Sequence, residues 1–203
     1  IMIPLRHPNV IRTYAVGRAA GTLCLAMEYI DGKSLRLLLQ EPNIPFRPLV
    51  SILCKAATGL FFVHQQGIVH RDVKPENILV SADLSQVKLI DFGYAARVRR
   101  HWWEPVPLRG GTEQYVAPEQ RCGAIDPRSD IYSFGVMLQE VLAGRMPPGD
   151  GSVEVVIARA TDPAPERRYQ SMAALATDFY DAVRPLLMSN HENRNSVRCP
   201  RES

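Results

Sequence analysis

The sequence has 203 residues, of which 46% are hydrophobic and 22% are charged, and its formal net charge is +3. This composition is that of an ordinary globular protein and excludes collagen-like, mucin-like and wholly disordered chains. The small and evenly spread positive charge gives no reason to expect a nucleic-acid partner or a membrane surface. No uninterrupted apolar run reaches the length of a membrane-spanning helix, so we expect no membrane segment.

The cysteines give a first indication of the compartment. The four cysteines lie far apart, without any C-x-x-C pair, which favours free thiols over a disulfide framework or a zinc site. No basic-then-apolar secretory signal stands at the start, so we expect a cytoplasmic protein. The chain opens with Ile1 and not Met, which leads us to expect a fragment or a trimmed product of a longer chain.

The first half of the chain is predicted to hold short strands around one long helix. Two apolar runs on either side of a glycine-containing stretch predict a hairpin with strands over 10–16 and 23–27. Apolar residues at three- and four-residue spacing then predict an amphipathic helix from Leu49 to Val63. Short β-rich runs at 78–80 and 87–90 predict two more strands, because both are too short for helices.

The second half is predicted to be mainly helical. Residues 94–112 show no periodicity and are expected to form a long loop, a feature that is usually functional in compact domains. Residues 130–143 are apolar nearly all round, which predicts a helix buried in the centre of the domain. Helical patterns near 152–160 and 171–183 follow, and the polar residues 188–203 are expected to form a disordered tail.

Two polar motifs flank the predicted strands at 78–80 and 87–90. The run H-R-D-V-K-P-E-N ends at Asn77, and D-F-G begins at Asp91, directly after the second strand. A hairpin between the motifs would bring Asn77 and Asp91 face to face, and amide and carboxylate oxygens suit Mg²⁺ together with substrate phosphates. Asp72 then lies where it could accept a hydroxyl proton, and Lys74 where it could neutralise a transferred phosphoryl group.

These motifs resemble the catalytic half of a eukaryotic-type protein kinase, and they are most similar to those of the bacterial serine/threonine kinases. Further matches occur in the order that the family shows, so that the resemblance covers roughly residues 5–183. They are M-E-Y-I at 27–30, which resembles the hinge, G-T-E-Q-Y-V-A-P-E at 111–119, S-D-I-Y-S-F-G at 129–135 and E-R-R-Y at 166–169. The identity of Lys74 favours Ser/Thr over Tyr acceptors.

The resemblance implies an α+β, protein-kinase-like fold. Residues 1–30 would be a β-hairpin remnant of the N-lobe together with the hinge, and residues 31–187 would be the helical C-lobe. The implied function is transfer of the γ-phosphoryl group of ATP to Ser or Thr hydroxyls of a protein substrate, with Mg²⁺ as the metal. No nucleic acid is expected as a partner.

The resemblance also implies roles for the motif residues. Asp72 would be the catalytic base and Lys74 the partner of the phosphate. Thr112 would tie the peptide-binding loop to both of them, and Asn77 and Asp91 would hold Mg²⁺.

The nucleotide would lie against the hinge. The backbone of Glu28, Tyr29 and Ile30 would form hydrogen bonds to the adenine edge. Leu79 would pack beneath the adenine ring, and Met27 would be the gatekeeper residue.

Three more residues would hold the site in place. The resemblance implies a buried ion pair between Glu119 and Arg168. It further implies that Asp130 anchors the catalytic loop, which is the H-R-D-V-K-P-E-N segment at 70–77, from the central helix.

The loop before the G-T-E-Q-Y segment lacks the hydroxyl that often switches such kinases. Residues 93–111 contain no Ser or Thr, so we expect no activation there by Ser/Thr phosphorylation. Either Glu104 pairs with Arg71, or packing of Trp102 and Trp103 orders the loop. An exposed ion pair contributes only about 0–1 kcal/mol, so tryptophan packing is the favoured anchor.

The segments that open the family's catalytic domain are absent from this sequence. No G-x-G-x-x-G occurs, and no lysine precedes Lys33, so the glycine-rich loop and the strand lysine are both missing. The resemblance therefore implies a chain that begins after most of the N-lobe.

Two other functions stay open. A pseudokinase or docking module would keep the C-lobe surface without phosphoryl transfer. A small-molecule phosphotransferase would share the Asp, Asn and Asp pattern, but it does not account for the A-P-E segment. A coding region that extends upstream to a glycine-rich loop would favour the enzyme, and a start codon near Met2 would favour the docking module.

Overall fold

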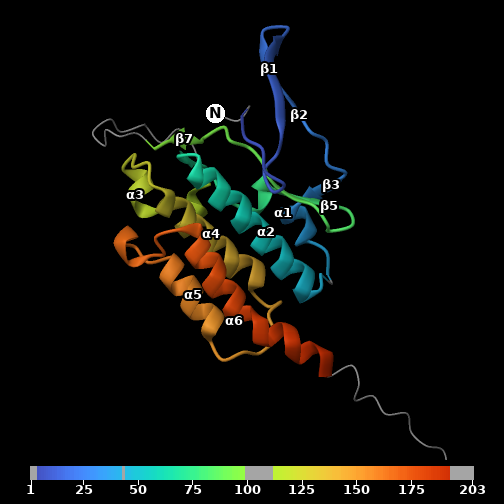
Figure 1. Cartoon of the computed structure of the whole chain (residues 1–203), viewed down its shortest axis with the longest axis vertical. Helices are drawn as coiled ribbons and strands as arrows, with labels where there is room; N and C mark the ends of the chain where they lie inside the picture. Colours follow the sequence, from blue (N-terminus) through green and yellow to red (C-terminus); the bar gives the residue numbers. More distant parts are fainter. Residues whose placement is uncertain (1–3, 43, 99–111, 193–203) are drawn as a thin grey trace, which may run out of the picture.

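A computed structural model describes the protein over residues 4–42, 44–98 and 112–192. Figure 1 shows a body of helices, with a narrow β-hairpin that projects from one end and a small sheet near its base. This is the α+β arrangement that the sequence predicts, with most of the described chain in the helical part.

The projecting hairpin consists of β1 (Thr13–Ala19) and β2 (Thr22–Met27), which pair in antiparallel fashion. The strands differ from the predicted ones, because the turn is Ala20–Gly21 and Gly17 lies inside β1. Both turn residues have positive φ, 48° and 82°, as a two-residue type I′ turn requires. Most of both strands is exposed, so no buried face marks their register in the sequence.

A three-stranded antiparallel sheet lies near the base of the hairpin. Its strand order is β3 (Gly32–Ser34), β5 (Ile78–Ser81) and β6 (Val87–Leu89). Residues 10–11, predicted as part of the hairpin, run beside β6 instead, and a backbone N–H there donates to the Leu89 carbonyl at 2.9 Å. Both of these apolar residues are buried, so burial against the body determines their place.

The longer helices form the body and enclose the hydrophobic core. They are α2 (Phe46–Gln65), α4 (Pro127–Leu142), α5 (Ser152–Ala160) and α6 (Met172–Glu192). As predicted, α4 is buried on most sides, and it packs against α2 and α5. It starts at Pro127, directly after Asp126, whose carboxylate accepts the Arg128 amide at 2.8 Å as a helix cap.

Short elements connect the helices and the sheets. They are α1 (Leu35–Leu38), α3 (Pro118–Arg121), β4 (Ile68–Val69), β7 (Ala96–Arg97) and the 3₁₀-helices η1 (Pro75–Asn77), η2 (Glu113–Tyr115) and η3 (Pro165–Arg167). Strand β7 falls inside the predicted long loop and pairs with β4, so at least this part of the loop is tied to the body.

Helix α6 ends later than the sequence indicates. Residues 188–192, predicted to begin the disordered tail, belong to this helix. Pro185 lies inside the helix and does not end it, and Leu186 still packs into the core. Adding one further turn to an established helix costs little, so the polar composition did not mark its end. The rest of the predicted tail, 193–203, lies outside the described residues.

Among the described helices, only α2 is long and apolar enough to cross a membrane. It has 20 residues and a mean hydropathy of 1.5 over its most apolar window. Within the protein, 56% of that window is buried, and the buried side chains belong to the hydrophobic core. The core of the body therefore accounts for the apolar character of α2.

The predicted ion pair between Glu119 and Arg168 is present at the edge of the body. Arg168 Nη1 and Nη2 donate to the two Glu119 oxygens at 2.7 Å and 2.9 Å, and the Arg168 side chain is fully buried. Its guanidinium also donates to three backbone carbonyls and lies 4.9 Å from the Tyr132 ring centroid. Burial alone would raise the pKa of Glu119, but hydrogen bonds from Arg168 and Ser129 hold it below its ordinary value.

We expect Arg168→Ala to destabilise the fold by about 3–5 kcal/mol, because it removes a fully buried side chain and leaves the partly buried Glu119 carboxylate without its partner. Thermal or urea unfolding measures the change. Arg167→Ala is the matched control: this side chain is exposed, and the expected change is within about 0.5 kcal/mol. Equal melting temperatures for the two variants would contradict the assignment of Arg168 as the stabilising arginine.

Candidate active site

The backbone of the H-R-D motif is held from the centre of the body. Asp130 in α4 is completely buried, and its two oxygens accept the amides of His70 and Arg71 at 2.8 Å each. Its Oδ2 also lies 2.8 Å from His64 Nε2. Arg71 has a φ of +69°, a strained value for a residue other than glycine, so these bonds fix a conformation that the chain would otherwise avoid.

His70 is a packing residue. Its ring is fully buried and lies against Phe92 with the ring centroids 4.7 Å apart. Burial lowers the pKa of His70, so the ring is neutral near pH 7. Nδ1 accepts the Asp72 amide at 3.3 Å, which leaves the proton on Nε2 to donate to the Ile90 carbonyl at 2.9 Å. The histidine thus connects the catalytic loop to the D-F-G segment.

The predicted catalytic residues converge on Asp72, which is only 4% exposed. Asn77 Nδ2 donates to Asp72 Oδ2 at 2.8 Å, and Lys74 Nζ lies 2.9 Å from the same oxygen. Lys74 Nζ also donates to Thr112 Oγ1 at 2.7 Å. Thr112 reaches Asp72 through its backbone amide, at 3.3 Å from Oδ1, and its hydroxyl serves Lys74. The sequence motif did not distinguish these two groups of Thr112.

Asn77 and Asp91 lie at the paired ends of β5 and β6, where the sequence predicts a metal site. The Ile90 amide donates to the Asn77 carbonyl at 2.9 Å, which brings the two motifs together. The Asn77 amide nitrogen is used by Asp72, so the side-chain oxygen is left for a cation. Asp91 is exposed and keeps an oxygen besides the one that accepts the Gly93 amide. This donor set fits Mg²⁺.

No competing metal site occurs in the part of the chain that the structure describes. No cluster of three or more His, Cys, Asp and Glu side chains there could hold an ion. A site made by Asn77, Asp91 and substrate phosphates is the type that Mg²⁺ prefers, since this ion keeps few protein ligands.

A cavity of about 570 Å³ lies between the hairpin and the D-F-G segment. Of the residues predicted to bind the nucleotide, Met27 and Asp91 line it. The remaining lining is mostly apolar and consists of Ile11, Val16, Leu23, Leu25, Ile90, Phe92, Gly93 and Ala95. Ile11 and Ile90 carry no motif, so only the folded chain reveals them. An apolar cavity with a few polar groups is typical of a small-molecule site.

The hinge residue Glu28 is fixed by contacts that the sequence did not indicate. Its amide donates to the Arg12 carbonyl at 2.9 Å, and its carboxylate pairs with Lys88 Nζ at 2.9 Å and 3.0 Å. The Glu28 N–H is therefore not available to a ligand. Hydrogen bonds to an adenine edge would come from the Glu28 carbonyl and the backbone of Tyr29 and Ile30.

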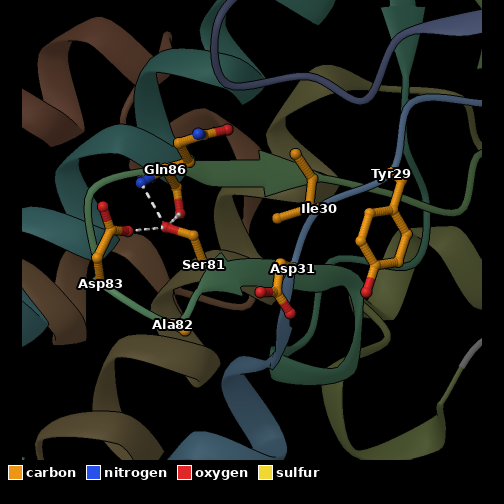
Figure 2. Close-up of a pocket in the computed structure, with 7 residues that line it drawn as sticks. All are labelled: Tyr29, Ile30, Asp31, Ser81, Ala82, Asp83 and Gln86. Atoms are coloured by element: carbon orange, nitrogen blue, oxygen red, sulfur yellow. Dashed lines mark hydrogen bonds between the residues drawn. The ribbon is translucent and has the colours of Figure 1, made fainter.

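The other predicted nucleotide-binding side chains lie outside this cavity. Figure 2 shows Tyr29 and Ile30 in a second, more polar cavity of about 300 Å³, which is also lined by Ser81 at the end of β5 and by Asp83 in the turn that follows. Tyr29 is 86% exposed. Leu79 is half-buried in β5 and lines neither cavity. The structure therefore brings the predicted catalytic and metal-binding residues together, but it separates the predicted nucleotide-binding side chains.

Part of the predicted loop lies outside the described residues. Trp102, Trp103 and Glu104 lie outside the described residues, so the anchoring of the loop stays a prediction. Arg71, the predicted partner of Glu104, is 6% exposed, and its Nε has no hydrogen-bond partner among the described residues.

The sequence is similar to those of known proteins over most of its length. The family described as "Protein kinase domain" matches residues 1–200. The chain is 39% identical over 202 residues to serine/threonine-protein kinase PknB of Mycobacterium tuberculosis, a match that covers 94% of this chain and 32% of PknB. It is 39% identical over 153 residues to serine/threonine-protein kinase pkn2 of Myxococcus xanthus, which covers 72% of this chain and 18% of that protein.

A third relative is serine/threonine-protein kinase PknL of Mycobacterium tuberculosis, 40% identical over 158 residues, with 76% of this chain and 39% of PknL covered. The chain thus spans between about a fifth and two fifths of the length of these relatives. The motifs of the catalytic loop lie within the matched range and in the hydrogen-bonded cluster around Asp72. On these grounds the chain belongs to the protein kinase family.

Proposed function

We propose that this chain is the catalytic part of a serine/threonine protein kinase, which transfers the γ-phosphoryl group of ATP to a Ser or Thr hydroxyl of a protein. The observation that carries the proposal is the cluster of Asp72, Lys74, Asn77 and Thr112, hydrogen-bonded at one edge of the sheet. The names of the similar proteins support the choice of serine and threonine as acceptors.

Asp72 is the residue that accepts the hydroxyl proton. Asn77 and Lys74 occupy both acceptor sites of Oδ2, and Oδ1, which accepts only the Thr112 amide, keeps a lone pair for the incoming hydroxyl. Lys74 also places a positive charge beside Asp72, where it offsets the negative charge of the phosphoryl group. Orientation and electrostatic stabilisation are the main contributions that a protein makes to phosphoryl transfer.

Mg²⁺ would be held by the side-chain oxygens of Asn77 and Asp91, and when bound it neutralises phosphate charge. The adenine would lie in the apolar cavity beside Met27, with the phosphates toward Asp91.

A docking module without phosphoryl transfer is the second candidate function. These 203 residues contain no G-x-G-x-x-G and no lysine before Lys33, so by themselves they lack the parts that cover and fix the phosphates in the family. The two candidates can be distinguished by measurement, because only a kinase transfers phosphate and loses that activity when Asp72 is replaced.

We expect Asp72→Asn to lower phosphoryl transfer by about 10²–10⁴-fold, the usual contribution of a general base. The measurement follows labelled γ-phosphate onto a protein substrate. It uses whichever form of the protein transfers phosphate, either this chain or the chain with its natural flanking sequence. Asp83→Asn is the matched control, because Asp83 is exposed on the far turn of the sheet. Near-normal transfer by Asp72→Asn would remove Asp72 from the mechanism.

We expect these 203 residues by themselves to bind Mg·ATP weakly, with a dissociation constant of about 1 mM, equivalent to about −4 kcal/mol. The cavity and the metal ligands are present, but no glycine-rich loop or strand lysine holds the phosphates. Titration calorimetry measures the affinity, and Asp91→Asn should weaken it further. Micromolar affinity together with autophosphorylation by this chain would contradict the expectation.

A further inference from the structure

A second polar cluster lies beside the catalytic loop and takes no part in the contacts around Asp72. Its members come from separate elements: Arg36 from α1, Glu76 from η1, Tyr115 from η2 and Glu140 from α4. Because η1 lies within the H-R-D-V-K-P-E-N motif, Glu76 is placed next to Asn77 in the chain. The cluster therefore joins the catalytic loop to three other parts of the body.

Arg36 makes the contacts that hold this cluster together. Its Nε donates to Glu76 Oε1 at 2.7 Å, and its Nη2 donates to Tyr115 Oη at 2.7 Å. Nη1 and Nη2 both donate to the carboxylate of Glu140, the second of them at 3.3 Å. The planar guanidinium thus contacts three acceptors at once, a pattern that the single ammonium of a lysine cannot reproduce.

Tyr115 transmits this arrangement to the segment that carries Thr112. The ring is buried, and the Tyr115 amide donates to the Thr112 carbonyl at 2.8 Å within η2. Burial and the neighbouring Glu140 raise the pKa of Tyr115, so the phenol stays protonated and donates a hydrogen bond to Glu140. The same oxygen accepts from Arg36, which fixes the position of the ring at one end of η2.

Glu76 transmits the arrangement to the catalytic loop. Among the described residues, Arg36 is the only donor to its carboxylate, since Oε2 is buried and has no hydrogen-bond partner. Within η1 the Asn77 amide donates to the Lys74 carbonyl at 3.0 Å, so the position of Glu76 is coupled to both neighbours. Lys74 and Thr112 meet at 2.7 Å between these two anchored segments.

We propose that Arg36 is a positioning residue, which sets the distance between the catalytic loop and the Thr112 segment. It would thereby shape the binding site of the protein substrate. The inference rests on the proposed function, in which Lys74 and Thr112 lie beside the accepting hydroxyl. Arg36 acts through Glu76 and Tyr115 and does not itself contact the reacting groups.

Helix α1 has anchors other than Arg36, so removal of the guanidinium should leave the fold intact. Leu35 and Leu38 are buried in the core, and the Ser34 hydroxyl caps the helix. Arg145 binds the other end of this helix, where its Nη2 donates to the Leu39 carbonyl at 2.9 Å. Arg145→Ala is therefore a matched control, which removes an arginine that contacts the same helix but has no hydrogen bond to Glu76 or Tyr115.

The first measurement needs no catalysis. Hydrogen exchange of the Thr112 and Asn77 amides should be roughly tenfold faster in Arg36→Ala than in the wild type, because a set of charge-assisted bonds is lost. The same two amides should also exchange faster in Arg36→Lys than in the wild type. Addition of methylguanidinium to Arg36→Ala should restore the protection of these amides, since it supplies the missing guanidinium group. Arg145→Ala should leave both amides as in the wild type.

The second measurement separates positioning from simple destabilisation. In a form of the protein that transfers phosphate, Arg36→Ala should raise the KM for a serine peptide roughly tenfold, with the KM for ATP and the melting temperature little changed. Unchanged exchange at Thr112 and Asn77, or full function in Arg36→Lys, would overturn the inference. Equal losses for peptide and ATP would also overturn it. A wild type that transfers no phosphate would count against the proposed function, and the exchange measurement would still decide this one.

Discussion

The candidate active site depends on one buried carboxylate. Asp130 has no exposed surface, yet its oxygens accept the amides of His70 and Arg71 and contact the ring of His64. A buried carboxylate without such donors would be very unfavourable, and a strained Arg71 backbone without this acceptor would relax. The loop amides thus supply the donors that the carboxylate needs, and the carboxylate holds the strained loop. Because Asp130 belongs to α4, the geometry around Asp72 depends on the placement of α4 in the core.

Other side chains of the site also make more than one contact each. Asn77 uses its amide nitrogen to hold Asp72, which leaves its oxygen for a cation, so in the proposed function one side chain would serve both the base and the metal. Lys74 contacts Asp72 and Thr112 and thereby joins the catalytic loop to the segment beyond the D-F-G loop. In contrast, the hairpin contributes mainly apolar side chains to the large cavity and few fixed polar contacts.

Sequence motifs predicted the parts of this site that are close in the chain or shared by the family. The cluster of Asp72, Lys74 and Asn77 lies in a single short segment, and the Glu119 and Arg168 pair follows from a family resemblance. The contacts of Arg36 were not predictable, because its partners lie 40, 79 and 104 residues away and share no local pattern. The hairpin turn and the end of α6 were missed because exposed residues carry little information on register or helix length.

Hydrogen exchange in Asp130→Asn tests whether the Asp130 carboxylate sets the conformation of the catalytic loop. The substitution keeps the size of the side chain but replaces one acceptor oxygen by an NH₂ group, so a buried amide of the loop loses its partner. If the carboxylate has this role, the His70 or Arg71 amide should exchange about 10–100-fold faster than in the wild type, equivalent to about 1.4–2.8 kcal/mol. The exchange rates of the β1–β2 hairpin amides should be unchanged. Unchanged protection of both loop amides would contradict this role of Asp130.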